Sequence, residues 1–460
     1  MDKKRIIIIG AGISGLATAH WLEKEGYDVT IIEEKTEPGG AMQTKLSNNF
    51  LIDFGTNSGT ETTPKIRELV NDIGLSNEMI YANENSKIRY ILKNNELTPL
   101  PTSPTQFLKT KLFSNSAKLR ILKEPFIGKS EDGYNQSIAD FVRRRLGDEF
   151  LENAIDPFVS GVFAGNPAEL SVKSAFPKLY RLEEKYGGLI KGTIKGARER
   201  RNNPEKSKQY AKMFSFKNGM QSFPRAIEKN LKGKKYYGSI VESISKQDKK
   251  IVIEMEYKGK KGKLTSDVLL STIPAYKLSK ISDSIDKELT KHLNEIYYPP
   301  VLVLFLGYDR EVITRELDGF GFLIPSKEKK SFLGAIWSSS IFVNRTSRET
   351  EAFTIFVGGT KNPDFKIDDV KNRIDEVLKE FHDIMGIDAN PTLIEWKFWN
   401  KAIPQYNIGY REHEEYFYKF EENNPGIFLG GNYIGGISVG DCIKSSYNNF
   451  EKIKKYLSKT

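Results

Sequence analysis

The sequence predicts an α/β fold that opens with a buried parallel sheet, and three observations near the N-terminus support this. Residues 6–9 form a β-branched run that ends at a glycine, as a buried parallel strand does. Glycines follow at the spacing G-x-G-x-x-G, directly before a segment whose apolar residues recur with helical period. A second strand, residues 29–32, ends at Glu33, which lies 23 residues after Gly10. Together these features predict a Rossmann-like, dinucleotide-binding domain.

The glycine turn and the start of the first helix are predicted to hold a pyrophosphate. The residues concerned are Gly10, Gly12, Ile13, Ser14 and Gly15. The first glycine permits the tight turn, the second lets the backbone approach the phosphates, and the third lets helix and strand pack closely. Free N–H groups and the helix dipole favour the phosphate charge there. Glu33 can bind a ribose, with Glu34 as the alternative ligand.

Length and composition limit the class of protein. The chain has 460 residues, of which 38% are hydrophobic, and a formal net charge of +10, so two or three packed domains are expected. A single cysteine, Cys442, excludes intrachain disulfides and cysteine-cluster metal sites, and it suits a reducing compartment such as the cytoplasm. No apolar run approaches the roughly 20 residues of a membrane-spanning helix. No motif supports nucleic-acid binding, although the basic charge permits it.

A second glycine-rich stretch and a following turn indicate which dinucleotide is bound. Gly39, Gly40 and Ala41 stand shortly after the ribose acid, and the run FLIDFGTN at residues 50–57 supplies an acid-x-Gly turn. This arrangement resembles the FAD-binding start of the flavin amine oxidase superfamily, in which the turn lies beside the flavin. The resemblance implies flavin contacts from Gly55, Thr56 and Asn57. The superfamily often has Arg or Lys where this chain has Ala41, so a cationic contact from that position is lost.

A glycine cluster near the C-terminus is a second candidate contact with the flavin. It reads GGNYIGGISVGDC over residues 430–442 and precedes a helix expected from about Asp441 to Leu457. The start of that helix could stabilise an anionic reduced flavin, or Asp441 could simply cap a surface helix. By resemblance the flavin site includes Gly431, Asn432, Ile437, Ser438 and Val439.

Five blocks spread over nearly the whole chain resemble the protoporphyrinogen oxidase family, in the family's order. They are residues 156–192 (beginning DPFVSGVFAGNPAELS), 319–326 (GFGFLIPS), 333–345 (LGAIWSSSIFVNR), 356–359 (FVGG) and 430–443 (GGNYIGGISVGDCI). The resemblance implies an FAD enzyme of haem biosynthesis. Such an enzyme removes six electrons from a porphyrinogen and passes them to oxygen, which gives hydrogen peroxide.

The resemblance leaves the substrate open between two porphyrinogens. The runs VSGVFAGNPAELS, LEEKYGGLIKG and GGNYIGG look more like the plant and Gram-negative type, which favours protoporphyrinogen IX. Close relatives in Gram-positive bacteria prefer coproporphyrinogen III, which is the alternative. A flavin amine oxidase would share the fold but should carry an aromatic pair beside the flavin, and Tyr433 stands alone in its block. The intact glycine turns disfavour a non-catalytic porphyrin carrier.

By position, the resemblance also assigns residues to the substrate. The backbone of Gly161 is expected beside the reacting methylene bridge, which makes it the catalytic contact. Expected residues of an apolar slot are Phe320, Gly321, Leu323, Ile336 and Phe356, and ordinary core packing would explain each of them equally well. Lys93 falls where some members carry a propionate-binding arginine, and we prefer it to nearby Arg89. Val241 is expected to contact the adenine side of FAD.

The resemblance implies three parts, two of them discontinuous. The FAD-binding domain should comprise residues 1–55, 206–275 and 415–460. A mixed-sheet substrate domain should comprise residues 56–89 and 276–414, and a helical, membrane-associating domain residues 90–205. Within the helical domain, residues 107–123 carry five cations, no acid and several large apolar side chains. Such a segment suits either a membrane-surface helix or a core-packed helix with a basic edge.

The histidines give no sign of acid–base or metal chemistry. There are four, His20, His292, His382 and His413, and none stands in a catalytic or metal-binding spacing. We therefore predict no histidine base and no metal, because dehydrogenation by a flavin needs positioning more than a strong base. The expected partners are a porphyrinogen, FAD and oxygen. Peripheral contact with the cytoplasmic membrane and a homodimer are left open.

Overall fold

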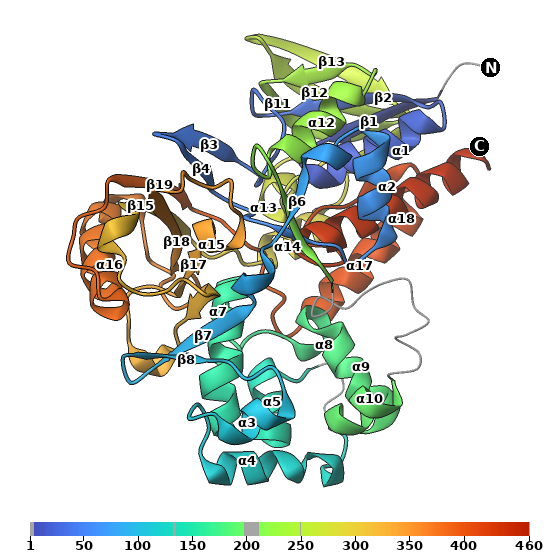
Figure 1. Ribbon diagram of the computed structural model, residues 1–460. Helices are drawn as coiled ribbons and strands as arrows, with labels where there is room; N and C mark the ends of the chain where they lie inside the picture. The colour runs from blue at the N-terminus through green and yellow to red at the C-terminus, as the bar shows by residue number, and fades with distance from the viewer. Residues whose placement is uncertain (1–3, 132–134, 197–210, 249, 460) are drawn as a thin grey trace.

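A computed structural model describes residues 4–131, 135–196, 211–248 and 250–459. These residues form a part built on a parallel sheet, a part built on a seven-stranded sheet, and a helical part (Figure 1). In that view the first lies at the upper right with both chain ends, the second at the left, and the helical part at the bottom. The predicted α/β class, with a Rossmann-like sheet and a mixed sheet, is confirmed.

The parallel sheet has five strands in the order β10-β2-β1-β14-β20. Their bounds are β1 Arg5–Ile9, β2 Asp28–Glu33, β10 Lys235–Tyr237, β14 Val268–Ser271 and β20 Ile427–Leu429. β1 is central, and its four isoleucines are at most 3% exposed because helices cover both faces of the sheet. Successive side chains of a strand point to opposite faces, so Ile6 and Ile8 enter one core while Ile7 and Ile9 enter another.

Elements from distant parts of the chain cover the two faces of this sheet. The first face packs against α1 Ile13–Lys24, α2 Pro64–Asp72, α12 Ser222–Asn230 and α18 Val439–Leu457. The second face packs against α13 Ala275–Leu278, α14 Lys287–Glu295 and α17 Tyr410–Asn423. An antiparallel meander also packs there, formed by β11 Ser239–Gln247, β12 Lys250–Tyr257 and β13 Lys260–Ser266. The sheet therefore joins the two ends of the chain and its middle into one unit.

The segment 59–81 packs with the parallel sheet, whereas the sequence analysis assigns residues 56–89 to the substrate domain. It forms β5 Gly59–Thr60, α2, η1 Ser76–Glu78 and β6 Met79–Tyr81, and β5 and β6 flank β9 Met213–Phe216. Helix α2 buries Ile66, Leu69 and Val70 in the same core as Ile6. The apolar stripe of this amphipathic helix contacts α18, a partner that the local sequence does not reveal.

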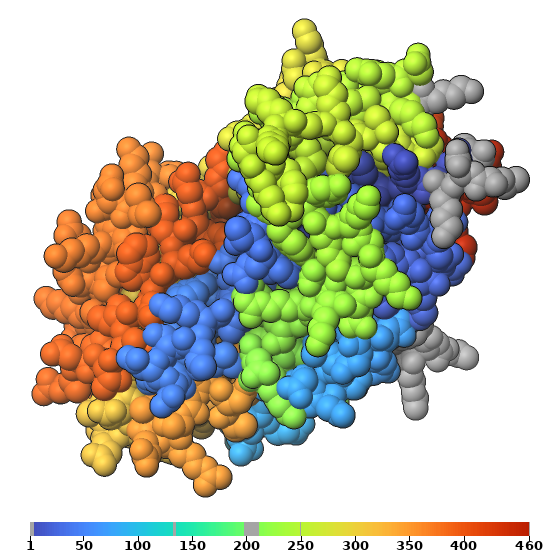
Figure 2. Space-filling view, turned by 90° about the horizontal axis from the view of Figure 1, so that it is seen from above, coloured from blue at the N-terminus to red at the C-terminus, as the bar shows by residue number. Residues whose placement is uncertain are grey.

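The seven-stranded mixed sheet has the order β19-β15-β18-β17-β16-β7-β8. Its strands are β7 Ile88–Lys93, β8 Glu96–Pro99, β15 Val301–Asp309, β16 Gly319–Leu323, β17 Gly334–Trp337, β18 Thr350–Gly358 and β19 Leu393–Trp399. All neighbours pair antiparallel except β16 and β7. Helix α16 Val370–Met385 covers one face, and the hairpin of β3 Thr44–Ser47 and β4 Phe50–Asp53 packs against the other. From above, blue N-terminal residues separate the orange mixed-sheet part from the yellow-green meander (Figure 2).

The helical part begins at residue 104 and not at residue 90, because β7 and β8 complete the mixed sheet. Its main helices are α3 Pro104–Lys109, α4 Asn115–Leu122, α5 Ile138–Leu146, α7 Asp156–Phe163, α8 Val172–Ala175, α9 Pro177–Tyr186 and α10 Leu189–Lys195. A single π-helical turn, Leu151–Ile155, leads into α7. The expected boundary between residues 205 and 206 lies outside the described residues.

A buried ion cluster ties the helices of this part together. The fully buried guanidinium of Arg145 on α5 is paired with Glu124 and with Glu183 of α9. Glu124 also accepts hydrogen bonds from the backbone N–H groups of Leu189 and Ile190 at 2.6 and 3.0 Å. Because each buried charge has partners, the cluster fixes α5, α9 and α10 relative to one another.

The basic segment 107–123 forms two short helices, α3 and α4, instead of one. Phe107, Leu112 and Phe113 pack inward against Ile91. Three leucines of the same segment are exposed, namely Leu108, Leu119 and Leu122. No helix of the described residues combines the length and the apolar character needed to cross a membrane.

Candidate functional site

The first glycine turn has the backbone geometry of a phosphate-binding loop. Gly10 has a φ of 108°, which an L side chain rarely adopts. A Cβ at residue 15 would lie 2.0 Å from the Gly10 carbonyl oxygen, so only glycine allows α1 to approach β1 this closely. The Thr272 hydroxyl donates to the same oxygen at 3.2 Å. Helix α1 then begins at Ile13 with no acidic residue in its first turn, which leaves its positive end available to an anion.

The second glycine pair lies against this turn. The Gly39 N–H donates to the Ala11 carbonyl oxygen at 2.9 Å. A Cβ at residue 40 would lie 3.2 Å from the Gly12 Cα, so two stretches of bare backbone face each other. They form a cradle beside the start of α1 that a side chain on either stretch would narrow. These glycines therefore allow the protein backbone to come as close to a bound dinucleotide as such a ligand requires.

Glu33 is held beside the turn, as the sequence analysis expects of a ribose ligand. Its carboxylate accepts hydrogen bonds from the backbone N–H groups of Ala11 at 2.7 Å and Lys35 at 2.9 Å. Glu34, the alternative, instead forms an exposed ion pair with a lysine of α13. Val241 on β11, the predicted adenine contact, is half-buried against the same core as Ile32 of β2. The geometry thus favours Glu33 over Glu34.

Two lysines that the sequence analysis did not single out bring positive charge to this region. Lys35 donates from Nζ to the Gly40 carbonyl oxygen at 3.0 Å. Lys35 and Lys397 both lie over the Trp399 ring, with Nζ 5.5 and 4.9 Å from its centroid. Burial, and then repulsion from Lys397, lowers the pKa of Lys35. These cations lie close to Ala41, the position at which the superfamily often has Arg or Lys. In the sequence, the only indication of such a cation was Lys35, which follows Glu33 by two residues.

The turn after β4 rests on a buried ion pair. The Asp53 carboxylate lies 2.6 Å from the Arg345 guanidinium, and both side chains are buried. Asp53 also accepts hydrogen bonds from the Thr44 hydroxyl and the Met220 N–H. Arg345 in turn donates to the Asn57 carbonyl oxygen at 3.3 Å. This pair fixes the backbone of the predicted flavin contacts Gly55, Thr56 and Asn57.

The C-terminal glycine block is anchored at both ends. Gly431 and Asn432 follow β20, and the Tyr406 hydroxyl donates to the Asn432 carbonyl oxygen at 2.7 Å. Ile437 leads to Ser438, which caps α18 in a capping box with Asp441, so the helix begins at Val439. A Cβ at residue 440 would lie 2.2 Å from the Thr62 hydroxyl oxygen, which shows how closely the start of α18 meets the segment after β5.

A cavity of about 300 Å³ lies between α7 and the mixed sheet. Its lining includes six of the predicted site residues, namely Gly55, Thr56, Asn57, Gly161, Ile336 and Phe356. Ala164, Val301, Leu333 and Ile403 add apolar surface. None of the described residues that line it is ionisable, so the cavity is suited to holding an apolar group and not to proton abstraction.

Strand register explains how distant residues reach one face of the mixed sheet. Gly321 pairs with Arg89 on one side and with Ile336 on the other, so all three share a face. Leu323 lies two residues along the same face, and a Cβ at residue 161 would lie 2.3 Å from its Cδ2. Phe320 lies beneath the Arg89 guanidinium, 5.2 Å from ring centroid to Cζ.

Lys93, the predicted propionate ligand, forms hydrogen bonds to the backbone. Its ammonium donates to the carbonyl oxygens of Lys111 and Leu112 at 2.9 and 3.0 Å, and it thereby ties β7 to the loop between α3 and α4. Arg89 lies at the surface with its guanidinium over the Phe320 ring, where partial burial lowers its pKa. The geometry therefore favours Arg89 as the cation at the cavity face.

The histidines lie away from the cavity. His20 contacts Asp72 on the surface, and His382 bonds to Tyr308 behind the sheet. His292 and His413, far apart in the sequence, are in direct contact with each other. The sequence could not reveal that contact, because the two residues lie on helices that meet only in the fold.

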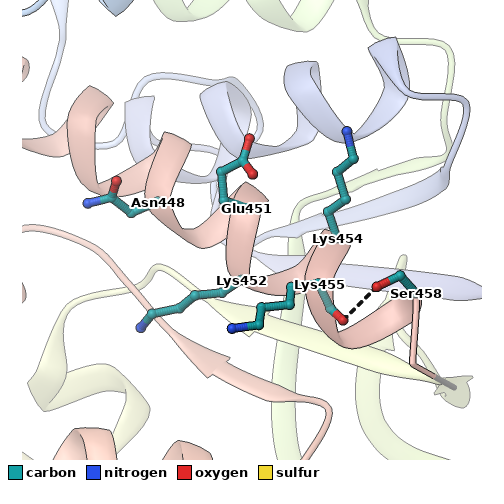
Figure 3. A pocket seen from close by; sticks show the side chains of 6 residues that line it. All are labelled: Asn448, Glu451, Lys452, Lys454, Lys455 and Ser458. Carbon is teal, nitrogen blue, oxygen red and sulfur yellow. Dashed lines mark hydrogen bonds between the residues drawn. The ribbon is translucent and has the colours of Figure 1, made fainter.

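A second, open concavity lies on α18 near the C-terminus, and its six lining residues are Asn448, Glu451, Lys452, Lys454, Lys455 and Ser458 (Figure 3). Lys452 pairs with Glu421 at 2.8 Å and Lys454 with Glu25 at 2.9 Å. Since none of the predicted site residues lies there, this concavity is separate from the candidate site.

Comparisons with known proteins identify the family of the chain. A family model described as flavin containing amine oxidoreductase matches residues 13–449. Protoporphyrinogen oxidase 2, chloroplastic/mitochondrial, of Arabidopsis thaliana is 31% identical, over 99% of this chain and 94% of its own length. Coproporphyrinogen III oxidase of Bacillus subtilis (strain 168) is 29% identical over 96% of both chains. The crystal structure named "Putative protoporphyrinogen oxidase from Exiguobacterium sp. 255-15" shares the fold with a TM-score of 0.81 at 22% identity, over 100% of both chains.

The residues of the site fit FAD. The backbone cradle of Gly12 and Gly40 can take the pyrophosphate, Glu33 beside the turn can accept hydrogen bonds from the ribose, and the turn at Gly55 opens on the cavity. When bound, FAD supplies the two-electron acceptor for the oxidation of a substrate in that cavity. The chain belongs to the flavin containing amine oxidoreductase family, and within it to the FAD-dependent porphyrinogen oxidases.

Proposed function

We propose that this protein oxidises protoporphyrinogen IX to protoporphyrin IX, with FAD as cofactor and oxygen as acceptor, in haem biosynthesis. The porphyrinogen loses six electrons and six protons, and three molecules of oxygen are reduced to three of hydrogen peroxide. The bonds that break are C–H and N–H bonds of an apolar macrocycle. The chain must therefore position the macrocycle and exclude water more than supply a strong base.

The cavity beside α7 is the observation that carries the proposal. It joins the turn at Gly55 to Gly161, Ile336 and Phe356, and no described residue that lines it is ionisable. Gly161 of α7 lines this cavity, and we assign its backbone the contact with the reacting methylene bridge. Ile336 and Phe356 supply the apolar contact that holds the ring.

We assign the propionate contact to Arg89. Its guanidinium lies over Phe320 on the face of the sheet that carries Gly321 and Ile336. A planar guanidinium can bind a carboxylate with two parallel hydrogen bonds. The exposed position of Arg89 leaves this charge available to a ligand.

The number of available cations supports protoporphyrinogen IX over coproporphyrinogen III. The first carries two propionates and two vinyl groups, whereas the second carries four propionates. Lys361, in the loop after β18, is already paired at 3.2 Å with Asp156 at the start of α7, and Lys93 is bound to backbone carbonyls. Arg89 therefore suits a substrate with few carboxylates. Coproporphyrinogen III is the alternative, since a relative that is named for it aligns over almost the whole chain.

Turnover of the two porphyrinogens tests the proposal. Purified flavoprotein receives protoporphyrinogen IX or coproporphyrinogen III in air, and porphyrin fluorescence and peroxide are followed. A control without enzyme is needed because porphyrinogens oxidise spontaneously. We expect faster oxidation of protoporphyrinogen IX. A clear preference for coproporphyrinogen III would establish the alternative, and turnover of neither would reject both and turn attention to amines.

We also propose that α3 and α4 attach the protein to the surface of an anionic membrane. Leu108, Leu119 and Leu122 are exposed, and Phe126 just beyond α4 is 89% exposed. Five cations lie among them in residues 107–123, and no acid does. These helices form the end of the helical part that lies farthest from the parallel sheet (Figure 1). Exposed apolar side chains among cations suit the boundary between headgroups and acyl chains.

Sedimentation with vesicles tests this attachment. We expect binding to vesicles of phosphatidylcholine with phosphatidylglycerol, weaker binding to phosphatidylcholine alone, and loss at high salt. Phe126→Ser combined with Leu122→Ser should abolish binding. Leu46→Ser is the matched control, because Leu46 is 71% exposed on the β3–β4 hairpin, outside this region. Equal binding by both variants would reject the proposal.

A cytoplasmic location, peripheral to the membrane, is consistent with a lone buried cysteine, Cys442. A homodimer stays a prediction that analytical ultracentrifugation of the purified protein would test.

A further inference from the structure

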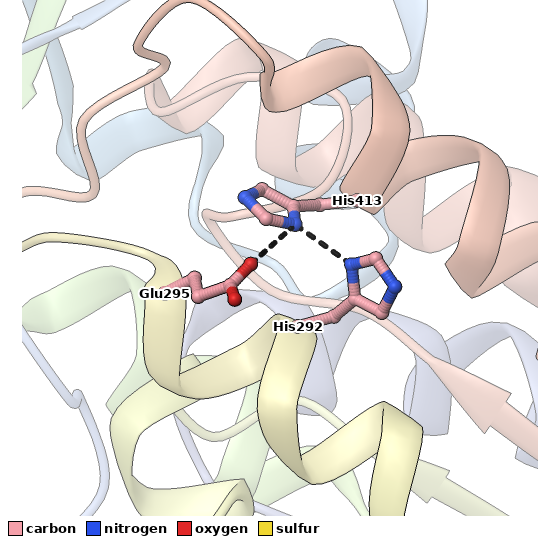
Figure 4. A group of neighbouring side chains, drawn as sticks. All are labelled: His292, Glu295 and His413. Carbon is pink, nitrogen blue, oxygen red and sulfur yellow. Dashed lines mark hydrogen bonds and ion pairs between the residues drawn. The ribbon is translucent and has the colours of Figure 1, made fainter.

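Three metal-ligating side chains converge on the outer side of the parallel-sheet part. His292 and Glu295 lie one helical turn apart on α14, and His413 reaches them from α17 (Figure 4). The two Nδ1 atoms lie 2.9 Å apart, and Glu295 Oε2 lies 3.8 Å from His413 Nδ1. One possible ligand atom of each residue lies within 4.8 Å of the others. The part of the chain that the structure describes holds no second group of this kind.

We propose that His292, Glu295 and His413 bind a divalent transition-metal ion of the zinc class, which clamps α14 to α17. Two imidazole nitrogens and one carboxylate oxygen form a common three-ligand set for zinc, and water completes the tetrahedron. Zn–N bonds of about 2.0–2.1 Å in a tetrahedron place two ring nitrogens roughly 3.3 Å apart. The observed pair of nitrogens needs to separate by only a few tenths of an ångström to accept the ion.

Aromatic neighbours hold both rings in place. Tyr416 stacks on His292 with a centroid distance of 4.3 Å and an interplanar angle of 18°, and its hydroxyl donates to Asp286 at 2.8 Å. Tyr410 meets His413 edge-on at 5.7 Å. Fixed rings lose little further freedom when a metal binds, which favours binding.

The local charge suits a cation. Glu295 is half-exposed beside the pair, and Glu288 lies 3.7 Å from His292 Nε2. Lys291 balances the charge of Glu288 at 2.9 Å, and the Glu295 carboxylate adds a further negative charge beside the two rings.

The clamp lies close to the flavin-side backbone. The ring of Tyr410 contacts His413, and its hydroxyl donates a hydrogen bond to the Tyr433 carbonyl oxygen. Tyr433 directly follows the predicted flavin contact Asn432. An ion that fixes α17 on α14 would therefore steady the segment between β20 and α18. The role is structural, since the site lies outside the cavity.

Metal analysis of the holoenzyme tests the proposal. FAD-loaded protein is stripped with chelator, dialysed against micromolar Zn²⁺ and analysed by mass spectrometry for bound zinc, with melting temperature as a second readout. We expect one Zn²⁺ per chain, no retention of Mg²⁺, and a higher melting temperature with zinc. Glu295→Gln and His413→Gln should each weaken zinc binding by about 10- to 100-fold or more and remove the thermal shift.

Two controls keep the result decisive. His20→Gln removes a histidine that also contacts a carboxylate, Asp72, in another part of the fold, and it should leave zinc binding unchanged. Glu295→Gln changes a half-exposed side chain and should fold normally even if His413→Gln does not. Zinc binding that Glu295→Gln leaves intact, or no zinc in the wild-type protein, would show that the histidines form only a hydrogen-bonded pair.

Discussion

At the scale of single residues, the missing side chain at position 161 lets Leu323 pack against α7 at the edge of the cavity. A Cβ there would lie 2.3 Å from Leu323 Cδ2, so Gly161→Ala must push Leu323 aside beside the cavity. We expect kcat/KM for the porphyrinogen to fall by about 10- to 100-fold, with little change in melting temperature. Gly262→Ala on β13 is the control, because nothing lies within 4 Å of its added Cβ. Equal activity of the two variants would contradict the assigned role.

Arg89 and Lys93 lie on the same strand face but have different partners. Arg89→Gln removes the charge assigned to a propionate, which should cost about 1.5–3 kcal/mol, or roughly 10- to 100-fold in kcat/KM, mainly through KM. Lys93→Met removes two hydrogen bonds to the loop at Lys111 and Leu112, so it should lower melting temperature and leave KM unchanged. Steady-state kinetics and thermal unfolding of both variants check this split. The reverse pattern would restore Lys93 as the propionate ligand.

At the scale of elements, the ion pair of Asp53 and Arg345 joins strand β4 to the segment that follows helix α15 Ser338–Ile341. Both side chains are buried, so Arg345→Leu leaves a charged carboxylate without its partner. We expect a loss of about 3–5 kcal/mol in the free energy of unfolding, measured in urea, and weaker FAD retention. Arg411→Leu breaks an exposed pair on α17 and should cost only about 0.3–0.5 kcal/mol.

The ion cluster of the helical part makes its stability depend on pH. Burial alone would raise the pKa of Glu183, but hydrogen bonds from the Ser130 N–H, Arg145 and Arg144 outweigh it and hold the pKa below its ordinary value of 4.5. The stabilisation is therefore complete above about pH 4.5 and is lost as the pH falls through the lower, folded-state pKa. The difference in unfolding free energy between wild type and Glu183→Gln should shrink below pH 4.5. A constant difference down to pH 3 would contradict this.

At the scale of the whole molecule, the cofactor site joins segments from both ends of the chain. The turn at Gly10 and the start of α18 belong to one unit only through the parallel sheet and its helices. A ligand that binds only the folded state stabilises it, by about 2.7 kcal/mol when its concentration is 100 times Kd. We expect FAD to raise the melting temperature of cofactor-depleted protein. Gly12→Val, which fills the cradle, should abolish that shift while Gly262→Ala retains it.

Local patterns were enough to predict the glycine turn and the helix after the C-terminal glycine block, whereas the ribose contact of Glu33 stays a prediction. Each depends on residues within one strand–turn–helix unit, where backbone sterics and spacing limit the alternatives. Val439 begins α18 two residues before the expected start, because Ser438 and not Asp441 provides the cap. The contacts of Lys93 could not be predicted, because its partners come from a loop that the sequence does not place beside β7, and its role at a propionate stays a prediction.

The sequence by itself determined the fold class, the cofactor-binding turn and the family, since strand composition, glycine spacing and motif order are properties of local segments. Only the tertiary structure decided what depends on contacts between distant segments. It placed residues 59–81 with the parallel sheet, brought Gly161, Ile336 and Phe356 to one cavity, and set His292 against His413. Such contacts depend on packing and on strand register, and both are determined jointly by side chains that lie far apart in the chain.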